Sequence, residues 1–338
     1  MTQRIALVIS GGGSKGAFAV GAVKHLMGTL GMEFDLFAGT STGALITPLL
    51  AAMGRAALPV LEREYTTVRD ADIIRPRQPE ETALVSSSFA TTDPLADRIR
   101  GQVTEAVWNA LRASPKQVFL TTVNLRTGRL VYFQTGPAAV PSNGDVVRVQ
   151  DRDTLMRAML ASASIPVLMQ PTPIPQGTPA EFVDGGVREY APIQVAIDAG
   201  VTDIVCILLA PAVRGPAEQR LDRLAGVLKR TIDLLSEEVG ENDVRTSQLY
   251  TQAVRYLAEV RLRLQRDHGL SQQQIDAAFA PPNAVNPFVG KRAVSLRIIR
   301  PQRRLAGETL GFDPAAMRAN LAYGTECAQQ QWPAGVLV

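Results

Sequence analysis

Two short apolar segments each lead into a glycine-rich turn and then into a helix-forming stretch, and this repeated pattern constrains the fold more than any other feature. "IALVIS" precedes "GGGSKG" and "AFAVGAVKHLM", while "FDLFAG" precedes "TST" and "GALITPLLAAMG". Strands that alternate with helices through tight turns form a parallel sheet with helices packed on its faces. The sequence therefore predicts an α/β fold with a mostly parallel central sheet flanked by helices.

The remaining apolar segments extend this sheet. Alternating residues in "QVFLTTVNLRTGRLVYFQT" predict a hairpin that turns at "RTG", and the apolar runs in "AEFVD", "DIVCILLAP" and "AVSLRIIRP" predict further strands. "TLMRAMLASASI" predicts a helix that ends before Pro166, and another helix is expected around residues 313–331. We expect one α/β domain over residues 1–338.

Two regions depart from the alternation of strands and helices. Residues 55–115 form a variable excursion of helices and loops, with no convincing strand from residue 60 onward, and its run "SSSFATTDP" could belong to a lid. Residues 212–290 form a helical insertion. Its apolar residues at spacings of three and four predict a helix face that packs on the sheet, with a membrane or partner as the alternative contact; they are Leu249, Ala253, Tyr256, Leu257, Val260 and Leu264.

The composition excludes several classes of protein. The formal net charge of +3 is too small to indicate nucleic-acid binding, and it is compatible with an anionic membrane surface as well as with an ordinary solvated surface. Cys206 and Cys327 offer neither a disulfide framework nor metal-ligand spacing, and Cys206 lies in an apolar strand segment. No secretory signal or transmembrane segment is apparent, which predicts a cytoplasmic protein, at most peripherally attached to membranes.

The first glycine-rich turn, from Gly11 to Gly16, fits two functions. Its G-x-G-x-x-G spacing, with Asp35 about twenty residues further on, matches a dinucleotide-binding loop. Glycines at a strand-to-helix junction can instead point backbone N–H groups at a developing oxyanion. The loop alone is therefore typical of an oxidoreductase and of an acyl-transfer enzyme.

The second turn, "GTSTG", has the G-x-S-x-G spacing of a nucleophile elbow, with Ser41 at its centre. Gly39 and Gly43 leave room for the adjoining strand and helix. The turn presents the Ser41 hydroxyl above the strand ends, at a helix N-terminus that favours developing negative charge. The alternative is a small-residue turn in which Ser41 caps the helix.

A serine nucleophile needs a base, and the chain contains two histidines. His25 lies among apolar residues of the first predicted helix and His268 at a predicted helix C-terminus, so neither follows a late strand as in α/β-hydrolases. "FVDGG" places Asp184 at the end of an apolar strand, before Gly185 and Gly186. A carboxylate hydrogen-bonded to a serine hydroxyl in a partly dry site can act as its general base.

Taken in order, "GGGSKG", "GTSTG" and "DGG" resemble the three motifs of the patatin-like phospholipase family, and "ASASIPVLMQP" and "VREYAPIQVAIDAG" resemble further family segments. The resemblance implies that Ser41 is the nucleophile, that Asp184 is its base without a histidine, and that the glycine loop stabilises a transition state rather than binding a cofactor. The sequence shows no Ca²⁺-binding loop signature, so we expect no metal in the chemistry. The resemblance also implies that Lys15 steers an anionic head group or fixes the loop. The oxyanion would be held by the N–H groups of Gly11, Gly12 and Gly13, and the motifs would be supported by Gly16, Gly39, Gly43, Gly185 and Gly186.

The resemblance favours a serine lipid acyl hydrolase that cleaves fatty-acyl esters of phospholipids or lysophospholipids through an acyl-enzyme. Acyl transfer to an alcohol, and hydrolysis of small esters or thioesters, are variants of the same chemistry. Two alternatives come from other classes. One is a non-catalytic protein that binds a partner through the helix of residues 241–268, and the other is a dinucleotide-dependent oxidoreductase built on the first loop and Asp35.

Overall fold

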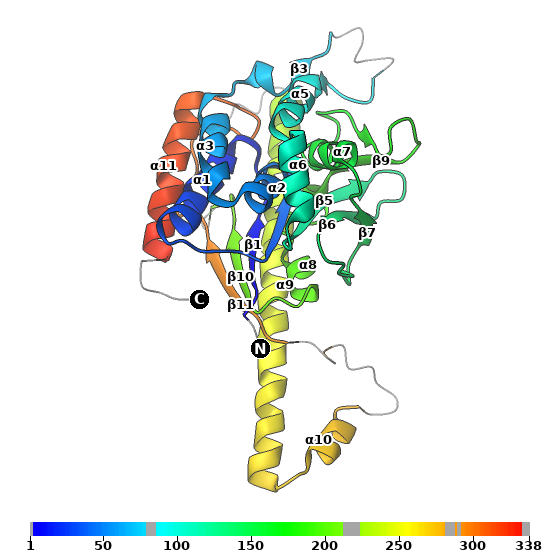
Figure 1. Cartoon of the computed structure of the whole chain (residues 1–338), viewed down its shortest axis with the longest axis vertical. Coiled ribbons are helices and arrows are strands. Elements are labelled where there is room, and N and C mark those ends of the chain that lie inside the picture. Colours follow the sequence, from blue (N-terminus) through cyan, green and yellow to red (C-terminus); the bar gives the residue numbers. More distant parts are fainter. Residues whose placement is uncertain (1–2, 79–85, 212–223, 281–287, 289–291, 333–338) are drawn as a thin grey trace.

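A nine-stranded sheet forms the centre of the computed structural model, which describes residues 3–78, 86–211, 224–280, 288 and 292–332 (Figure 1). Its strands are β1 Ile5–Ile9, β2 Leu36–Thr40, β5 Gln117–Asn124, β6 Leu130–Thr135, β7 Asp145–Arg148, β8 Thr172–Pro173, β9 Glu181–Asp184, β10 Asp203–Ile207 and β11 Ser295–Ile299. Five of them run parallel in the order β11-β10-β1-β2-β5, which confirms the mostly parallel sheet expected from the sequence.

Past β5 the sheet continues with antiparallel pairings, except that β7 runs parallel to β6. β6 returns beside β5 as the predicted hairpin, and β9 also runs antiparallel to β5, so that Asp184 lies opposite Thr122. Ser41 follows β2, the other neighbour of β5. The sheet thus brings the second and third sequence motifs to adjacent strand ends.

Helices cover both faces of the sheet. Alternate residues of β1 point to opposite sides, so Leu7 and Ile9 enter one apolar layer while Ala6 and Val8 enter the other. Helices α1, α2, α3, α5, α6, α7 and α11 pack in the first layer, and α8 and α9 in the second. Their bounds are α1 Gly16–Val23, α2 Thr42–Met53, α3 Ala57–Thr67, α5 Asp93–Gln102, α6 Glu105–Ala113, α7 Arg152–Ser162, α8 Ile193–Asp198, α9 Leu224–His268, α10 Gln272–Ala278 and α11 Pro314–Gln331.

One stretch, Thr42–Thr67, is long and apolar enough to cross a membrane by length and composition. The helix is interrupted at Gly54, where α2 has ended and a short 3-10 turn leads into α3. Helix α2 packs on β1, β2 and β5, and most of its residues are buried. Packing in the core of the α/β domain therefore accounts for this apolar composition.

The excursion of residues 55–115 contains one small sheet that the sequence did not predict. β3, Arg75–Pro76, pairs antiparallel with β4, Ala90–Thr91. Two-residue strands are too short to produce an alternating pattern, which explains why they were missed. Residues 79–85 lie outside the described residues, and the assignment of a lid here stays a prediction.

Helix α9 forms most of the predicted helical insertion and extends well beyond the sheet, with α10 near its far end (Figure 1). The predicted packing face is wrong at two of its six positions: Leu249 and Tyr256 are 66% and 70% exposed, whereas the other four residues are partly buried. The most buried side of α9 carries two valines together with small and polar residues at spacings of three and four: Gly240, Val244, Ser247, Thr251 and Val254. The largest apolar residues of the predicted face therefore do not mark the side that packs. Residues 212–223, 281–287 and 289–291 of the insertion lie outside the described part.

Candidate active site

Ser41 occupies a strained turn between β2 and α2. Its backbone has φ 56°, a left-handed conformation that is costly for a residue with a Cβ and is found mainly where function requires it. The flanking glycines permit the close approach: a Cβ on Gly39 would lie 2.3 Å from the Gly43 carbonyl carbon, and a Cβ on Gly43 would lie 2.2 Å from the Ile9 carbonyl oxygen. The turn thus has the geometry of a nucleophile elbow.

Asp184, at the end of β9, lies in the wall of the same cavity as Ser41, and its carboxylate accepts a 2.7 Å hydrogen bond from the Gly186 amide. Both side chains of the pair are buried, with 6% of Ser41 and 5% of Asp184 exposed. Burial raises the pKa of the Asp184 carboxyl to about 6, while the hydrogen bond from the Gly186 amide and the nearby Ser41 hydroxyl act to lower the pKa. A carboxyl with this pKa is ionised at neutral pH and close enough to it to exchange a proton.

The glycine-rich loop lies against this pair. A Cβ on Gly11 would lie 3.3 Å from the Ser41 Cβ and 2.9 Å from the Tyr190 ring, so the approach requires glycine. However, the Gly11 amide already donates to the Tyr190 carbonyl at 3.0 Å, which corrects its assignment to the oxyanion hole. Among the described residues, the amides of Gly12 and Gly13 donate to no protein acceptor and are left for that role.

The other motif glycines also mark close contacts. A Cβ on Gly16 would lie 2.3 Å from the Thr42 hydroxyl, and one on Gly185 would lie 2.5 Å from the Thr121 carbonyl oxygen. Gly186 lies near the Asp184 carboxylate, where a Cβ would come within 3.0 Å of Oδ1. These glycines let the three motifs pack tightly together.

Asp35 lies at the wrong end of the sheet for a ribose-binding acid. It precedes β2 and accepts a 2.8 Å hydrogen bond from the Ile5 amide, beside the first residue of β1. The glycine loop follows the last residue of β1, and five residues of strand span about 16 Å. A dinucleotide held by the loop would therefore not reach Asp35 in the way that this class of enzyme requires.

Neither histidine lies near Ser41. His25 is buried, with Nε2 3.1 Å from the Trp332 carbonyl oxygen, and His268 is the last residue of α9. In the described part of the chain, the two cavities that reach Ser41 have no histidine in their walls. The positions expected for both histidines from the sequence are confirmed, and Asp184 is a carboxylate that lies in the same cavity as Ser41.

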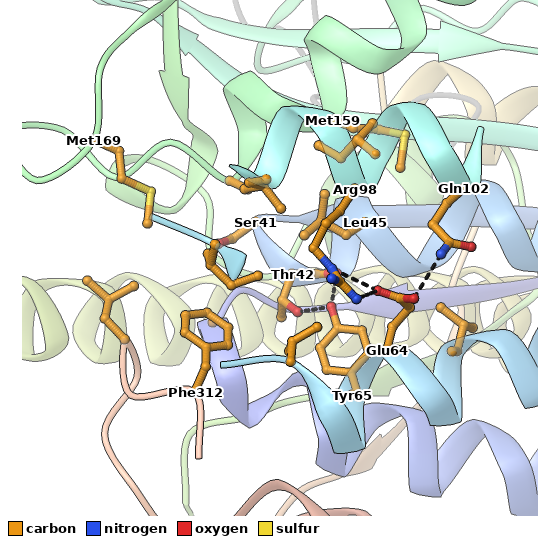
Figure 2. Close-up of a pocket in the computed structure, with 18 of the residues that line it drawn as sticks. Ser41, Thr42, Leu45, Glu64, Tyr65, Arg98, Gln102, Met159, Met169 and Phe312 are labelled. Carbon is orange, nitrogen blue, oxygen red and sulfur yellow. Dashed lines mark hydrogen bonds and ion pairs between the residues drawn. The ribbon is translucent and has the colours of Figure 1, made fainter. Parts of the chain in front are cut away.

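Two cavities meet at Ser41. A polar cavity is lined by Asp184, Lys15 and the glycine loop. An apolar pocket lies beyond Thr42 and Leu45, and Figure 2 shows Ser41 at one side of it. The arrangement joins a buried serine–carboxylate pair to both a polar and an apolar binding space.

Comparison with known proteins decides the family. Residues 7–197, more than half of the chain, match the sequence model of the family described as patatin-like phospholipase. The chain belongs to the patatin-like phospholipase family. This confirms the family inferred from the three motifs.

Individual relatives of this patatin-like protein are distant. Patatin-like phospholipase domain-containing protein 7 of Rattus norvegicus is 28% identical over 205 residues, which are 60% of this chain and 13% of the rat protein. VipD from Legionella pneumophila is 13% identical with a TM-score of 0.40, over 98% of this chain and 67% of VipD. The ExoU–SpcU complex from the type III secretion system of Pseudomonas aeruginosa is 17% identical with a TM-score of 0.29, over 71% of this chain and 50% of the matched chain.

In this patatin-like protein, helix α9 forms one wall of the polar cavity. The Asp243 carboxylate on α9 accepts hydrogen bonds from the amides of Tyr190 and Ala191, at 2.8 and 2.9 Å. These contacts tie α9 to the segment that follows the Asp184 motif. The α9 residues that line the cavity are Ile232, Asp233, Ser236 and Glu237.

Lys15 is held inside the polar cavity rather than free in solution. Its Nζ donates to the Thr309 hydroxyl at 3.0 Å, and this hydroxyl donates to Asp233 at 2.8 Å. Burial lowers the pKa of Lys15, and the nearby Asp233 and Glu237 carboxylates oppose that shift in its pKa. The two carboxylates beside the Lys15 ammonium disfavour the binding of a further anion there. The contacts therefore favour a role for Lys15 in fixing the loop over a role in steering an anionic head group.

Ser162 and Ser164, at the end of α7, brace the candidate catalytic pair, and sequence reasoning assigned them no role. The Ser162 hydroxyl accepts from the Ser41 amide at 3.0 Å and donates to the Thr121 carbonyl at 2.7 Å. The Ser164 carbonyl accepts from the Asp184 amide at 2.9 Å. The available signal was the stretch "ASASIPVLMQP", which resembled the family without a function for its serines.

Replacing Ser162 with alanine should destabilise the protein by about 1–3 kcal/mol, because it leaves the buried Ser41 amide and Thr121 carbonyl unpaired. We also expect the turnover number of the ester hydrolysis proposed below to fall about tenfold, since a nucleophile must be held precisely. Denaturant titration and steady-state kinetics measure the two effects. Ser164→Ala is the matched control, because the Ser164 hydroxyl donates to the Leu160 carbonyl near the end of α7 and not to the candidate pair. Equal effects in both variants would contradict the bracing role.

Proposed function

We propose that this chain is a serine lipid acyl hydrolase in which Ser41 is the nucleophile and Asp184 its general base. The observation that carries the proposal is that one cavity holds both a serine in a strained elbow and a buried carboxylate whose pKa is raised to about 6. The family assignment supports the same chemistry. Phospholipids and lysophospholipids are the proposed substrates.

In the acylation step, Asp184 takes the proton of the Ser41 hydroxyl as Oγ attacks the carbonyl carbon of the ester. The resulting oxyanion is held by the amides of Gly12 and Gly13 and by the positive end of α2, which begins at Thr42. When the tetrahedral intermediate collapses, the bond to the alcohol breaks and Asp184 returns the proton to the departing alkoxide. The products are an acyl-Ser41 ester and a free alcohol.

In the deacylation step, water occupies the place of the alcohol. Asp184 takes a proton from this water as its oxygen attacks the acyl carbon, and the same amides hold the second oxyanion. Collapse breaks the acyl–Ser41 bond, and the proton on Asp184 passes to Ser41 Oγ. The cycle releases a fatty acid and restores both side chains, without a metal or an organic cofactor. Among the described residues, no group of three or more His, Cys, Asp or Glu could hold a metal ion.

The two cavities at Ser41 fit the two parts of a lipid ester. The apolar pocket suits the acyl chain, because its walls are mostly aliphatic and aromatic side chains. The polar cavity, with Lys15 and Ser236, suits the uncharged glycerol oxygens of the alcohol part, while its Asp233 and Glu237 carboxylates disfavour the phosphate group at the same place. The scissile carbonyl would then lie between them, beside Ser41.

The hydrolytic rate should depend on pH through Asp184. A general base works in its ionised form, so the raised pKa of about 6 predicts a rate that is constant above pH 7 and falls about tenfold per pH unit below 6. Values of kcat/KM for a soluble ester between pH 4.5 and 8.5 measure this dependence. A midpoint below pH 5 would contradict the role of a buried base.

A second buried carboxyl titrates in the same range and needs its own control. Burial raises the pKa of Asp243 to about 7, and Asp243 holds the amides of Tyr190 and Ala191. The Asp243→Asn variant keeps a side-chain oxygen that can accept from both amides but no longer titrates. The midpoint of the kcat/KM profile of this variant should remain near pH 6. If its kcat/KM no longer fell at acidic pH, the pH dependence would be due to Asp243 rather than to Asp184.

Release of fatty acid from mixed phospholipid vesicles tests the proposed function directly. We expect phospholipid to be consumed, with one fatty acid released for each ester bond cleaved. The rate of release should not depend on added NAD(P) or divalent cations. Chelator-treated protein serves as the control for contaminating metal. Absence of hydrolysis of vesicles, micellar lysophospholipids and soluble esters alike would contradict the proposal.

One observation favours a second function, binding of a partner protein. Leu249 and Tyr256 on α9 are largely exposed, as expected for a helix face that another molecule covers. This surface is remote in sequence from Ser41, so it can coexist with hydrolysis. Ester hydrolysis by the purified wild-type protein, without a partner, would exclude a purely non-catalytic role.

A further inference from the structure

Residues 165–169 line both cavities of the candidate site and also carry an exposed valine. Ile165 lies in the walls of both cavities, Pro166 in the wall of the polar cavity and Met169 in that of the apolar pocket. Between them, the Val167 side chain is 50% exposed, and its backbone has φ 71°. A β-branched residue rarely adopts this left-handed conformation, and such strain is found mainly where function requires it. The strain at Val167 therefore needs a reason, because it only serves to hold an apolar side chain in solvent.

Two more exposed apolar side chains lie around the same segment. Phe89 is 45% exposed, and its amide donates to the Val167 carbonyl at 3.0 Å. Val187 lines the polar cavity together with Pro166, yet it is 47% exposed. Because a cavity wall residue that is half exposed lies where the cavity opens, these residues border the mouth of the polar cavity. We call Phe89, Val167 and Val187 the apolar rim.

Three arginines lie beside the apolar rim. The Arg77 amide donates to the Phe89 carbonyl at 2.9 Å, and Arg75, two residues earlier, is exposed. Arg188 follows Val187 and is also exposed. The Arg77 and Arg188 guanidinium groups donate to uncharged acceptors, the Gln170 side chain at 2.8 Å and a backbone carbonyl at 2.6 Å. Within the described part of the chain, none of the three arginines has a carboxylate partner.

The acidic side chains of this region belong to cavity walls. Asp233 and Glu237 line the polar cavity, and Glu308 lines a small cavity that shares Ile165 with it. Arginines beside exposed apolar side chains are typical of surfaces that bind anionic membranes, because the apolar groups enter the boundary of the acyl chains while the guanidinium groups contact lipid phosphates.

We propose that the apolar rim and its three arginines dock this protein on an anionic lipid membrane, so that the mouth of the polar cavity faces the lipid headgroups. The proposal rests on the proposed function, because a site that takes phospholipids must open toward the layer that holds them. A partner protein on the same surface would instead close the mouth. Docking also gives the exposed, strained Val167 an apolar environment.

Co-sedimentation with sucrose-loaded vesicles measures docking apart from hydrolysis, since it uses the Ser41→Ala background. The vesicles contain phosphatidylcholine alone or with about one third phosphatidylglycerol, which supplies the negative charge. The rim variant is Phe89→Ser/Val167→Asn, and neither residue lines a cavity at Ser41. The matched control is Leu249→Ser/Tyr256→Ser, which removes two exposed apolar side chains from α9.

The protein with an intact rim should bind the anionic vesicles at least tenfold more tightly than the neutral ones, and added salt should weaken this binding. The rim variant should lose at least tenfold in affinity for the anionic vesicles, while the α9 control keeps the full affinity. Arg75→Gln/Arg188→Gln should lose about tenfold, and only with anionic vesicles.

Thermal denaturation separates a loss of docking from a loss of folding. Asparagine tolerates a positive φ better than valine does, so Val167→Asn alone should have a Tm at or above that of wild type. Its affinity for anionic vesicles should nevertheless fall about threefold, because one apolar side chain is removed. If the double rim variant does not fold, this single variant carries the test.

Hydrolysis measured with Ser41 intact separates this proposal from the function on which it rests. The rim variant should cleave a soluble ester as fast as wild type but anionic vesicles at least tenfold more slowly. Vesicle binding that depends on the rim, without hydrolysis of any ester, would contradict the hydrolase but support the docking surface. Unchanged vesicle binding in the rim variant would overturn the docking surface alone. Loss of binding in the α9 control instead, or no binding of wild type to either kind of vesicle, would overturn it as well.

Discussion

Replacing Ser41 with alanine should lower ester hydrolysis by roughly 10⁴- to 10⁶-fold, because the attacking oxygen itself is removed. The effect should appear in kcat, with little change in the affinity for a fatty acid, since the walls of the apolar pocket stay in place. Stability should change little. Alanine keeps the Cβ that makes φ 56° costly, so the backbone strain at this position is the same in both proteins.

Steady-state hydrolysis of a soluble ester and thermal denaturation measure these effects. Ser271→Ala is the control for serine removal, because Ser271 only caps α10, far along the chain from the elbow. Its activity should equal that of wild type. Residual activity of Ser41→Ala above one hundredth of the wild-type rate would mean that another group attacks the ester.

Replacing Asp184 with asparagine should lower kcat by about 10²- to 10⁴-fold, the usual contribution of general acid–base catalysis. The amide can accept the hydrogen bond from the Gly186 amide through its oxygen, so the local geometry is kept. It cannot take the Ser41 proton. A rate within tenfold of wild type at pH 8 would contradict the assignment of the base.

The same variant should be more stable than wild type at neutral pH. Because burial raises the pKa of Asp184 from 3.8 to about 6, the folded protein binds its proton more tightly than the unfolded chain does. Stability from this group is therefore full below pH 3.8 and is lost as the pH rises through 6, at a cost of about 3 kcal/mol for two pKa units.

Asparagine carries no charge at any of these pH values and avoids that cost. The Tm of Asp184→Asn should thus exceed that of wild type at pH 8, and the difference should shrink toward pH 4. Paired thermal melts at the two pH values measure it. A Tm below wild type at pH 8 would mean that the carboxylate stabilises the fold, contrary to its raised pKa. This gain in stability also separates a loss of catalysis from a loss of folding.

Local patterns predicted the parallel part of the sheet and the residues of the candidate pair. The turns around Ser41 and after β1 are coded by glycines whose spacing reflects contacts within a few residues, and β1, β2 and β10 are continuous apolar runs. Asp184 was identified because it follows an apolar strand segment and precedes two glycines. Its position beside Ser41, however, depends on the antiparallel pairing of β9 with β5, which no local pattern specifies.

The features that were missed depend on contacts between distant segments. The Gly11 amide is occupied by Tyr190, and the Ser41 amide by Ser162, both more than one hundred residues away. Helix α9 packs through Gly240 against the Tyr190 ring, where a Cβ would lie 2.8 Å from the ring, so closeness rather than hydrophobicity sets its face. An amphipathic pattern records which side is apolar, but on α9 the large apolar residues Leu249 and Tyr256 are exposed and the smaller Val244 packs inward.

The most direct test of the Ser41–Asp184 pair is fluorophosphonate labelling followed by mass spectrometry of the peptides. We predict one adduct in the wild-type protein, located on Ser41, none in Ser41→Ala, and labelling at least tenfold slower in Asp184→Asn at pH 8. An adduct on another residue would contradict Ser41 as the nucleophile. Equal labelling rates in wild type and Asp184→Asn would contradict Asp184 as the base that activates it.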